Sequence, residues 1–288
     1  MNVAHDLAEL GSRERAVALG SFDGVHRGHR RVLEAVRAAP LPPTVVTFWP
    51  HPRAVLGDGI PLLTTLERRL EFFAEAGIDE VLVLPFTLEL AELEPAVFAE
   101  RVLRRIGANV IVVGENFRFG RRAAGDVALL ARLGFDVRPV PLVGGVSSTR
   151  IRQLVAGGEV KTAARLLGRP PEVEGVVVGG EGRGGRLGYP TANLDVPTEL
   201  LVPADGIYAG AGLGHRAALS IGTNPHYGGN ERSIEPYLLD FDGDLYGSRL
   251  VVELWSRLRD EQAFASEEEL VEQIARDVEA ARVAVRPE

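Results

Sequence analysis

Two histidines stand three positions apart in the segment GSFDGVHRGH (residues 20–29), at His26 and His29. The apolar run AVALG (16–20) predicts a buried strand before them, and a helix is expected to begin near Gly28. A turn from strand to helix at the carboxyl edge of a parallel sheet is where α/β folds bind nucleotides, and the helix start attracts anions. Two imidazoles facing one bound phosphate group would suit nucleotidyl transfer, because their N–H donors stabilise charge on the α-phosphoryl oxygens and the departing pyrophosphate. The alternative is that both histidines lie at the surface or cap the helix.

A second group of polar side chains opens another predicted helix, in the string VSSTRIR. Ser147, Ser148 and Thr149 offer hydroxyl groups, and Arg150 and Arg152 follow them. Hydroxyl groups at a helix start commonly serve only as N-caps. Together with the helix dipole and arginine they also form a clamp for pyrophosphate. Two such helix starts in one α/β domain would match the two ends of a triphosphate.

The second half of the chain offers oxygen donors and a carboxylate. In GEGRGGRLGYPTANL, the hydroxyl of Thr191 and the amide oxygen of Asn193 are suitable partners for Mg²⁺ together with phosphates. The alternative there is a flexible turn between strands. Glu235 stands in the apolar segment SIEPYLLDF, where it would serve as a general base if it faced a pocket, or else faces outward on an alternating strand. Pro236 removes a ladder donor beside it, which predicts a strand edge or a bulge.

The composition excludes several classes of chemistry. The chain has 288 residues, a formal net charge of −8 and no cysteine, so disulfides, thiolate nucleophiles and cysteine-ligated zinc are ruled out. Lys161 is the single lysine, and no GxxxxGK[ST] string occurs, which excludes a P-loop kinase. The acidic balance disfavours non-specific nucleic-acid binding, and no apolar run approaches the ~20 residues of a membrane span. With no signal-peptide pattern at the N-terminus, a cytoplasmic enzyme is expected.

The elements expected around these residues change character along the chain. Short β-branched runs in the first half predict parallel strands of a doubly wound α/β domain at 16–20, 44–48, 81–85 and 110–114. A capping box of Thr64 and Glu67 is expected to open one intervening helix, and Gly77 to end it. The proline- and glycine-rich string GRPPEVEG predicts a boundary between domains 1–168 and 169–288.

Beyond that boundary the pattern predicts a different architecture. Short, turn-separated apolar runs are typical of a small antiparallel β-barrel or sandwich. Leu270, Ile274 and Val278 recur at helical spacing, which predicts a closing helix.

Longer strings resemble a known family. HxGH with SSTxxR is similar to the nucleotidyltransferase superfamily, and GSFDGVHRGHRRVL, TFWPHP and GENFRFGRRAAGD resemble the FMN adenylyltransferase module of bacterial bifunctional riboflavin kinase/FAD synthetases. The resemblance implies that ATP phosphates are contacted by His26, His29, Ser148, Thr149 and Arg152. It also implies that the two histidines and Arg152 are catalytic residues. It implies a wider ATP site that includes Gly20, Ser21, Phe22, Asp23, Gly28, Ser147 and Arg150. The flavin site implied in this module comprises Phe48, Trp49, His51, Pro52, Asn116 and Phe117.

One position departs from the family pattern. Many relatives carry an acidic residue within TF-x-PHP, where this chain has Trp49. An indole there would stack on an isoalloxazine or simply pack against the protein. If the acidic group places metal or flavin, adenylyltransferase activity would be weakened here.

The second half resembles the riboflavin kinase module through LGYPTANL, GIYAG, IGTNPHYGG, IEPYLLDF with LYG, and LRDEQAF, in that order. This resemblance implies a six-stranded β-barrel in which Thr191 and Asn193 hold Mg²⁺ and phosphate. Glu235 would take the proton of the ribityl 5′-hydroxyl as that oxygen attacks the γ-phosphorus of ATP. The implied ATP site also includes Gly182, Gly188 and Pro190, and the implied flavin site includes Arg259.

We therefore expect a two-domain enzyme: a Rossmann-like nucleotidyltransferase domain followed by a six-stranded antiparallel barrel with a terminal helix. The barrel would convert riboflavin and ATP to FMN and ADP, and the first domain would convert FMN and ATP to FAD and pyrophosphate, both with Mg²⁺. The alternative is an adenylyltransferase for another small phosphorylated substrate beside a flavin-binding barrel without catalysis. Small molecules are the expected partners, with no nucleic acid and no membrane, and the chain is expected to be a monomer or weak homo-oligomer.

Overall fold

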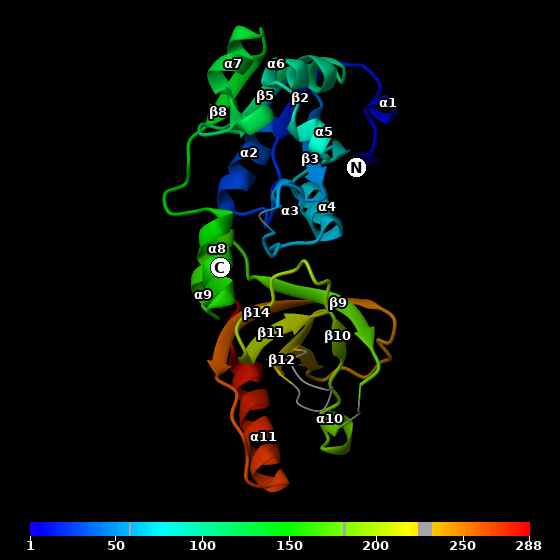
Figure 1. Cartoon of the computed structure of the whole chain (residues 1–288). Helices are drawn as coiled ribbons and strands as arrows, with labels where there is room; N and C mark the ends of the chain where they lie inside the picture. The colour runs from blue at the N-terminus through cyan, green and yellow to red at the C-terminus, as the bar shows by residue number, and fades with distance from the viewer. Residues whose placement is uncertain (58, 181–182, 224–231) are drawn as a thin grey trace. The chain divides into compact units, whose positions relative to one another are not determined.

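The computed structural model describes residues 1–57, 59–180, 183–223 and 232–288. By their internal contacts they form two compact units (Figure 1). The first comprises Met1–Ile60 with Thr64–Ser147, and the second comprises Pro61–Leu63 with Ser148–Glu288. None of the helices in the described part of the chain is long and apolar enough to cross a membrane.

The first unit is built on a six-stranded sheet with strand order β1-β4-β3-β2-β5-β8. Every neighbouring pair in it is parallel. Its strands are Asn2–Ala4 (β1), Arg15–Leu19 (β2), Pro43–Trp49 (β3), Glu80–Pro85 (β4), Ala108–Gly114 (β5) and Asp136–Val140 (β8). The chain leaves β2 towards β3 on one side and reaches β5 on the other, so the order reverses at β2. The predicted doubly wound α/β fold of this half is confirmed.

Short helices connect these strands. They are Leu7–Leu10 (α1), Arg27–Arg37 (α2), Pro52–Val55 (α3), Leu66–Glu75 (α4), Leu88–Ala91 (α5), Pro95–Phe98 (α6) and Val127–Arg132 (α7). A π-helical stretch continues α6 over Ala99–Arg104 (η1), and a 3₁₀ turn spans Arg121–Ala123 (η2). A small hairpin pairs Arg118–Phe119 (β6) with Gly125–Asp126 (β7).

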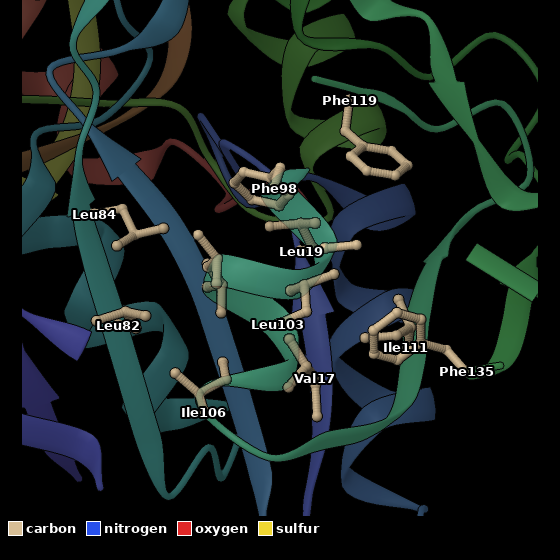
Figure 2. Packing of buried hydrophobic residues seen from close by; sticks show 14 of the residues in the cluster. Val17, Leu19, Leu82, Leu84, Phe98, Leu103, Ile106, Ile111, Phe119 and Phe135 are labelled. Atoms are coloured by element: carbon tan, nitrogen blue, oxygen red, sulfur yellow. The ribbon is translucent and has the colours of Figure 1, made fainter. Parts of the chain in front are cut away.

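Strand β2 is buried along its whole length because a hydrophobic cluster covers each face of the sheet. Val17 and Leu19 face the cluster that α6, η1 and α7 complete, and Figure 2 shows them with Phe98 and Leu103. The alternate residues of β2 face the other cluster, with α2 and α4. Each fully buried aliphatic or aromatic side chain contributes roughly 1.5–3 kcal/mol. The carboxyl end of β2, from which the turn to α2 follows, is therefore packed on both faces of the sheet.

Three local features of this unit differ from expectation or were not predicted. Strands β1 and β8 were not predicted: β1 has three residues, and β8 is an edge strand with largely exposed side chains. The predicted capping box of Thr64 and Glu67 is wrong. The hydroxyl of Thr65 caps α4 instead, accepting a hydrogen bond from the Arg68 N–H at 3.0 Å. The hydroxyl of Thr64 does not cap α4 and instead contacts Asp23 and Gly24.

The second unit contains a six-stranded antiparallel sheet with order β10-β9-β14-β11-β12-β13. Its strands are Glu172–Val178 (β9), Asn193–Asp195 (β10), Gly206–Gly212 (β11), His215–Thr223 (β12), Arg232–Leu238 (β13) and Arg249–Arg259 (β14). The Ala192 N–H donates to the Pro236 carbonyl at 2.9 Å, so the chain before β10 lies along β13 and nearly closes the sheet. The predicted six-stranded barrel is confirmed.

Pro236 lies on a strand at the end of this order, as its missing N–H predicted. The β12–β13 register is unbroken around it, so the edge and not the bulge is correct.

Among its described residues, the second unit has four helices: Ser148–Ala156 (α8), Val160–Leu167 (α9), Arg183–Arg186 (α10) and Glu267–Val283 (α11). Val160 of α9 is part of the barrel core, which explains why α8 and α9 group with the barrel by contacts. Ala281 of α11 packs on Ala209 and Ala218 of β11 and β12. The domain boundary predicted at 168–169 from the proline- and glycine-rich string stays a prediction, whereas the two compact units divide between Ser147 and Ser148.

Candidate active sites

The turn between β2 and α2 brings His26 and His29 together. His26 is the N-cap of α2, and its Nδ1 accepts a hydrogen bond from the His29 N–H at 3.2 Å. The two rings are stacked, with centroids 3.6 Å apart and planes 15° from parallel. An imidazole that accepts at Nδ1 and is neutral carries its proton on Nε2. The capping interpretation is thus correct for His26, and it fixes which ring nitrogen can donate to a ligand.

Glycine and phenylalanine shape this pair of rings. A Cβ on Gly28 would lie 3.1 Å from Cε1 of His26, so the position between the histidines has little room for a side chain. Phe22 packs edge-on against the His29 ring, with centroids 5.3 Å apart, and is itself buried. The ring positions therefore depend on close packing as well as on the helix cap.

The preceding residues expected at this ATP site, Gly20, Ser21 and Asp23, make hydrogen bonds within the protein. The Gly20 N–H donates to the Val46 carbonyl at 3.1 Å, and the Ser21 carbonyl accepts from the Thr47 hydroxyl at 3.3 Å. Both bonds tie the turn to β3. Asp23 is 2% exposed, and its carboxylate accepts hydrogen bonds from Thr64. Its side chain thus faces the protein rather than the surface of the turn.

The TFWPHP segment forms the end of β3 and the start of α3. His51 is buried and caps α3, with Nδ1 accepting from the Arg53 N–H at 3.2 Å, and Pro52 is the first helical residue. Phe48 meets Phe86 edge-on at 5.6 Å between ring centroids. Trp49 is half-buried and packs against the cluster that contains α2 and α4, so packing accounts for at least part of its indole surface.

The GENFRFG segment follows β5. Phe117 stacks on Phe119 with ring centroids 5.7 Å apart and planes 11° from parallel, while Asn116 is exposed. The Phe117 N–H donates to the Gly114 carbonyl at 2.9 Å, which closes a tight turn at the strand end. Phe117 also packs against the hydrophobic cluster that contains Val17 and Leu19, so Asn116 is the more exposed of the two side chains after β5.

In the SSTRIR string, residues 148–152 open α8 and belong to the second compact unit, whereas Ser147 is the last residue of the first unit. Ser147, Thr149 and Arg150 are exposed, and Ser148 is half-buried. The Nε of Arg152 donates to the Pro61 carbonyl at 2.8 Å, a contact inside the second unit. Their expected place at the adenylyl-transfer site stays a prediction.

In the barrel, Thr191 and Glu235 meet. The Thr191 hydroxyl donates to Oε2 of Glu235 at 3.5 Å. Neighbouring residues on β13 face the core, so Glu235 faces away from it and yet is only partly exposed. Tyr189 and Tyr237, two positions away on each segment, meet edge-on at 5.6 Å between centroids. Glu235 therefore points outward on its strand, with the Thr191 segment beside it, and its expected place in a pocket stays a prediction.

The surroundings of Thr191 and Asn193 fit a hydrated cation bound with phosphates. A Cβ on Gly180 would lie 2.1 Å from Nδ2 of Asn193, and one on Gly184 would lie 3.0 Å from Oγ1 of Thr191. Glycine at both positions therefore lets the backbone pack closely against Thr191 and Asn193, whose oxygens are the type of donor that Mg²⁺ prefers. Among the described residues no group of three or more acidic, histidine or cysteine side chains could hold a metal. A cation here would therefore rely on these neutral oxygens, on Glu235 and on phosphate oxygens.

The remaining predicted residues of the barrel site are less informative. Gly188 has φ of 86°, a left-handed conformation that suits glycine, and Pro190 is exposed. Gly182 lies outside the described residues. Arg259 makes a forked ion pair with Asp277 of α11, with Nη2 and Oδ2 2.7 Å apart, so its guanidinium holds the C-terminal helix to β14.

The structure also brings in two residues that were not predicted for the first site, Thr64 and Arg69. Arg69 is fully buried, and its Nη2 lies 3.8 Å from Oδ1 of Asp23. The sequence contained one signal for it: a charged residue on the apolar stripe of α4 formed by Leu66, Leu70 and Phe73. Thr64 carried no such signal, because its partner lies 41 positions earlier.

The fold and these two clusters define a nucleotidyltransferase-type α/β unit joined to a β-barrel with a hydroxyl–carboxylate site. Comparison with known proteins agrees. The family model for FAD synthetase matches residues 9–153, and that for riboflavin kinase matches residues 167–285. A bifunctional riboflavin kinase/FMN adenylyltransferase of Escherichia coli is 37% identical, covering 96% of this chain and 95% of that protein. The corresponding protein of Bacillus subtilis is 31% identical, covering 95% and 93%.

A solved structure shares the fold of the whole chain. It is described as a macrolide-efflux protein from Streptococcus pneumoniae, with a TM-score of 0.87, 32% identity, and coverage of 98% of this chain and 99% of the other. With the matches above, the chain belongs to the family of bifunctional riboflavin kinase/FMN adenylyltransferases. The family resemblance predicted from the motifs is confirmed.

Proposed function

We infer that the chain makes flavin cofactors in two ATP-dependent steps and propose which residues carry each one. The barrel phosphorylates riboflavin to FMN, and the first domain adenylylates FMN to FAD and releases pyrophosphate. Membership of the family supports both activities, each with ATP and a flavin as substrates.

In the barrel we assign Glu235 as the general base. Its carboxylate accepts the proton of the ribityl 5′-hydroxyl while that oxygen attacks the γ-phosphorus and ADP leaves. The Thr191 hydroxyl, 3.5 Å from Oε2 of Glu235, orients the carboxylate and the phosphate that approaches it. Thr191 and Asn193 would hold the divalent cation, which we propose to be Mg²⁺. When bound, that ion neutralises charge on the phosphates. Positioning and charge neutralisation then suffice without a P-loop lysine.

In the first domain we assign His26 and His29 to the α-phosphoryl group. The phosphate of FMN attacks the α-phosphorus of ATP, and pyrophosphate departs from the opposite side. The Nε2–H of His26, directed by the Nδ1 cap bond, donates to the oxygens on which charge accumulates. Ser148, Thr149 and Arg152 are proposed to contact ATP phosphates. The residues proposed to line the flavin are Phe48, Trp49, His51, Asn116 and Phe117.

The contact between Thr191 and Glu235 carries the kinase assignment, because it joins a hydroxyl and a carboxylate from segments 44 residues apart. The test is a time course with riboflavin, ATP and Mg²⁺, with products separated by chromatography. Glu235→Gln should lose FMN formation from riboflavin and keep FAD formation from added FMN. His29→Ala should show the mirror result.

Each variant is the folding control of the other, since both activities are read on one chain. Normal phosphorylation of riboflavin by Glu235→Gln would remove the base assignment. Absence of FMN formation in the unaltered protein, with FAD formation intact, would favour a flavin-binding barrel without catalysis. A cytoplasmic location, a monomeric or weakly oligomeric state and the absence of nucleic-acid binding remain predictions.

A further inference from the structure

The turn that carries His26 and His29 has an unfavourable backbone conformation. Phe22 and Val25 have φ of 52° and 36°, in the left-handed region that residues with a Cβ seldom adopt. Val25 is β-branched, for which this region is especially rare. Such conformations persist only where surrounding contacts hold them. The contacts that hold this turn therefore decide where the two imidazoles lie.

Thr64 supplies several of those contacts from outside the turn. Its hydroxyl accepts from the Gly24 N–H at 3.1 Å and donates to Oδ1 of Asp23 at 3.3 Å. Its own backbone N–H donates to the same Oδ1 at 3.2 Å. All three bonds are buried, where an N–H or carboxylate left unsatisfied is costly. One threonine thus fixes both central residues of the turn, between Phe22 and Val25.

Arg69 connects this arrangement to the TFWPHP segment. Its Nη2 lies 3.8 Å from Oδ1 of Asp23 and donates to the Thr64 carbonyl at 3.5 Å. Its Cζ lies 5.8 Å from the ring centroid of Trp49, within the range of a cation–π contact. Both Arg69 and Asp23 are almost wholly buried, so the arginine compensates a carboxylate that has little access to water.

We propose that Thr64 and Arg69 are positioning residues for adenylyl transfer, acting through Asp23 on the turn that holds His26 and His29. This inference rests on the proposed role of the two histidines. Neither residue belongs to the HxGH or TFWPHP string. Asp23 then has a role inside the protein: its carboxylate is the anchor that Thr64 and Arg69 bind.

The experiment compares Thr64→Val with Thr44→Val in the full chain. Thr44 is a matched control, because its hydroxyl also donates to a buried carboxylate, Glu80, at 3.3 Å, beside a buried arginine, Arg15. Thr44 lies near the start of β3, whereas the His26 turn follows the end of β2. We expect Thr64→Val to lower kcat for FAD formation about 10- to 100-fold, because sub-ångström to ångström misplacement of a catalytic group costs that much.

FMN formation by the same chain should stay unchanged in both valine variants, and Thr44→Val should keep its FAD formation. Thr64→Ser, which retains the hydroxyl, should recover most of the lost rate. If Thr64→Val lowered FAD formation only by destabilising the fold, Thr44→Val would lower FAD formation equally when both variants lose the same melting temperature. FAD formation that falls no further in Thr64→Val than in Thr44→Val overturns the inference.

A double-mutant cycle tests whether Thr64 acts through the histidines. In a His29→Ala background, Thr64→Val should reduce the residual rate by less than about threefold, since residues that act as one unit are not additive. Two fully multiplicative losses would show that Thr64 acts elsewhere. The single variant His29→Ala distinguishes failure of the positioning role from failure of the proposed histidine role. Full FAD formation in that variant refutes the proposed role of the histidines, and with it any positioning role exerted through these rings.

Arg69 is tested in the same assay with Arg69→Lys and Arg69→Met. Lysine keeps the charge beside Asp23 and should lose less FAD formation than methionine. Adding Asp23→Asn to Arg69→Met removes the buried negative charge that no longer faces the Arg69 guanidinium, and it should restore part of the loss. Equal rates for the lysine and methionine variants, both close to the unaltered protein, would exclude Arg69 from the positioning role.

Discussion

Glu80→Gln should destabilise the first unit by about 3 kcal/mol, the lower end of the range for breaking a buried ion pair. Oε2 of Glu80 accepts from Nε of Arg15 at 2.8 Å, and Arg13 lies 3.0 Å away. Arg15 is fully buried at the start of β2, so the amide would leave its guanidinium without an anion. Backbone carbonyls of Leu10, Gly11 and Ile106 also accept from Arg15, which is why the lower end of the range applies.

The pH dependence of this loss has a definite sign. Burial raises the pKa of Glu80, but hydrogen bonds and charge from Arg15 and Arg13 outweigh it, so the net pKa is below the ordinary 4.5. A carboxyl whose folded pKa is depressed contributes stability above its unfolded pKa, and that contribution is lost as the pH falls through the folded pKa. The difference between Glu80→Gln and the unaltered protein should be full at neutral pH and shrink below about pH 4.5.

The assay is heat inactivation followed by both activity measurements. For a unit of this size, 3 kcal/mol corresponds to a shift of roughly 6–12 °C in the midpoint. FAD formation should be lost at correspondingly lower temperature, while FMN formation, carried by the barrel, should not shift.

The control for this prediction is Asp136→Asn. Its carboxylate pairs with Arg138 at 2.9 Å, but both side chains are exposed, and such pairs contribute about 1 kcal/mol or less. Equal midpoints for Glu80→Gln and Asp136→Asn would refute the reasoning that burial makes the Arg15–Glu80 pair important.

Three further predictions follow from the two sites. Gly28→Ala should lower FAD formation and leave FMN formation intact in initial-rate assays, because its Cβ would lie 3.1 Å from Cε1 of His26. Gly180→Ala, whose Cβ would lie 2.1 Å from Nδ2 of Asn193, should reduce FMN formation about tenfold or more. Gly185→Ala, with no atom within 4 Å, is its control and should keep the rate. Chelation with EDTA should abolish both reactions and added Mg²⁺ should restore them; persistence of either rate would contradict a metal requirement there.

The linear sequence was enough to predict the elements that hold the sites. Buried strands such as β2 and β5 appear as continuous apolar runs because both faces of a parallel sheet are covered. Motif residues such as His26 and Thr191 could be identified because their chemistry depends on residue type and short spacing. Strand β8 was missed, since its exposed edge position needs no apolar pattern. Thr64 was misassigned as a helix cap, because two adjacent threonines satisfy the same local signal.

Reading the chain alone was thus sufficient for the buried strands, the two groups of reactive side chains and the family to which they belong. The folded protein was needed to see that Asp23 faces inward to Thr64 and Arg69, and that the segment containing Thr191 lies beside Glu235. The reason is physical. Periodicity and caps report contacts within a few residues, whereas these partners are 41 and 44 positions apart and meet only when sheet and barrel form.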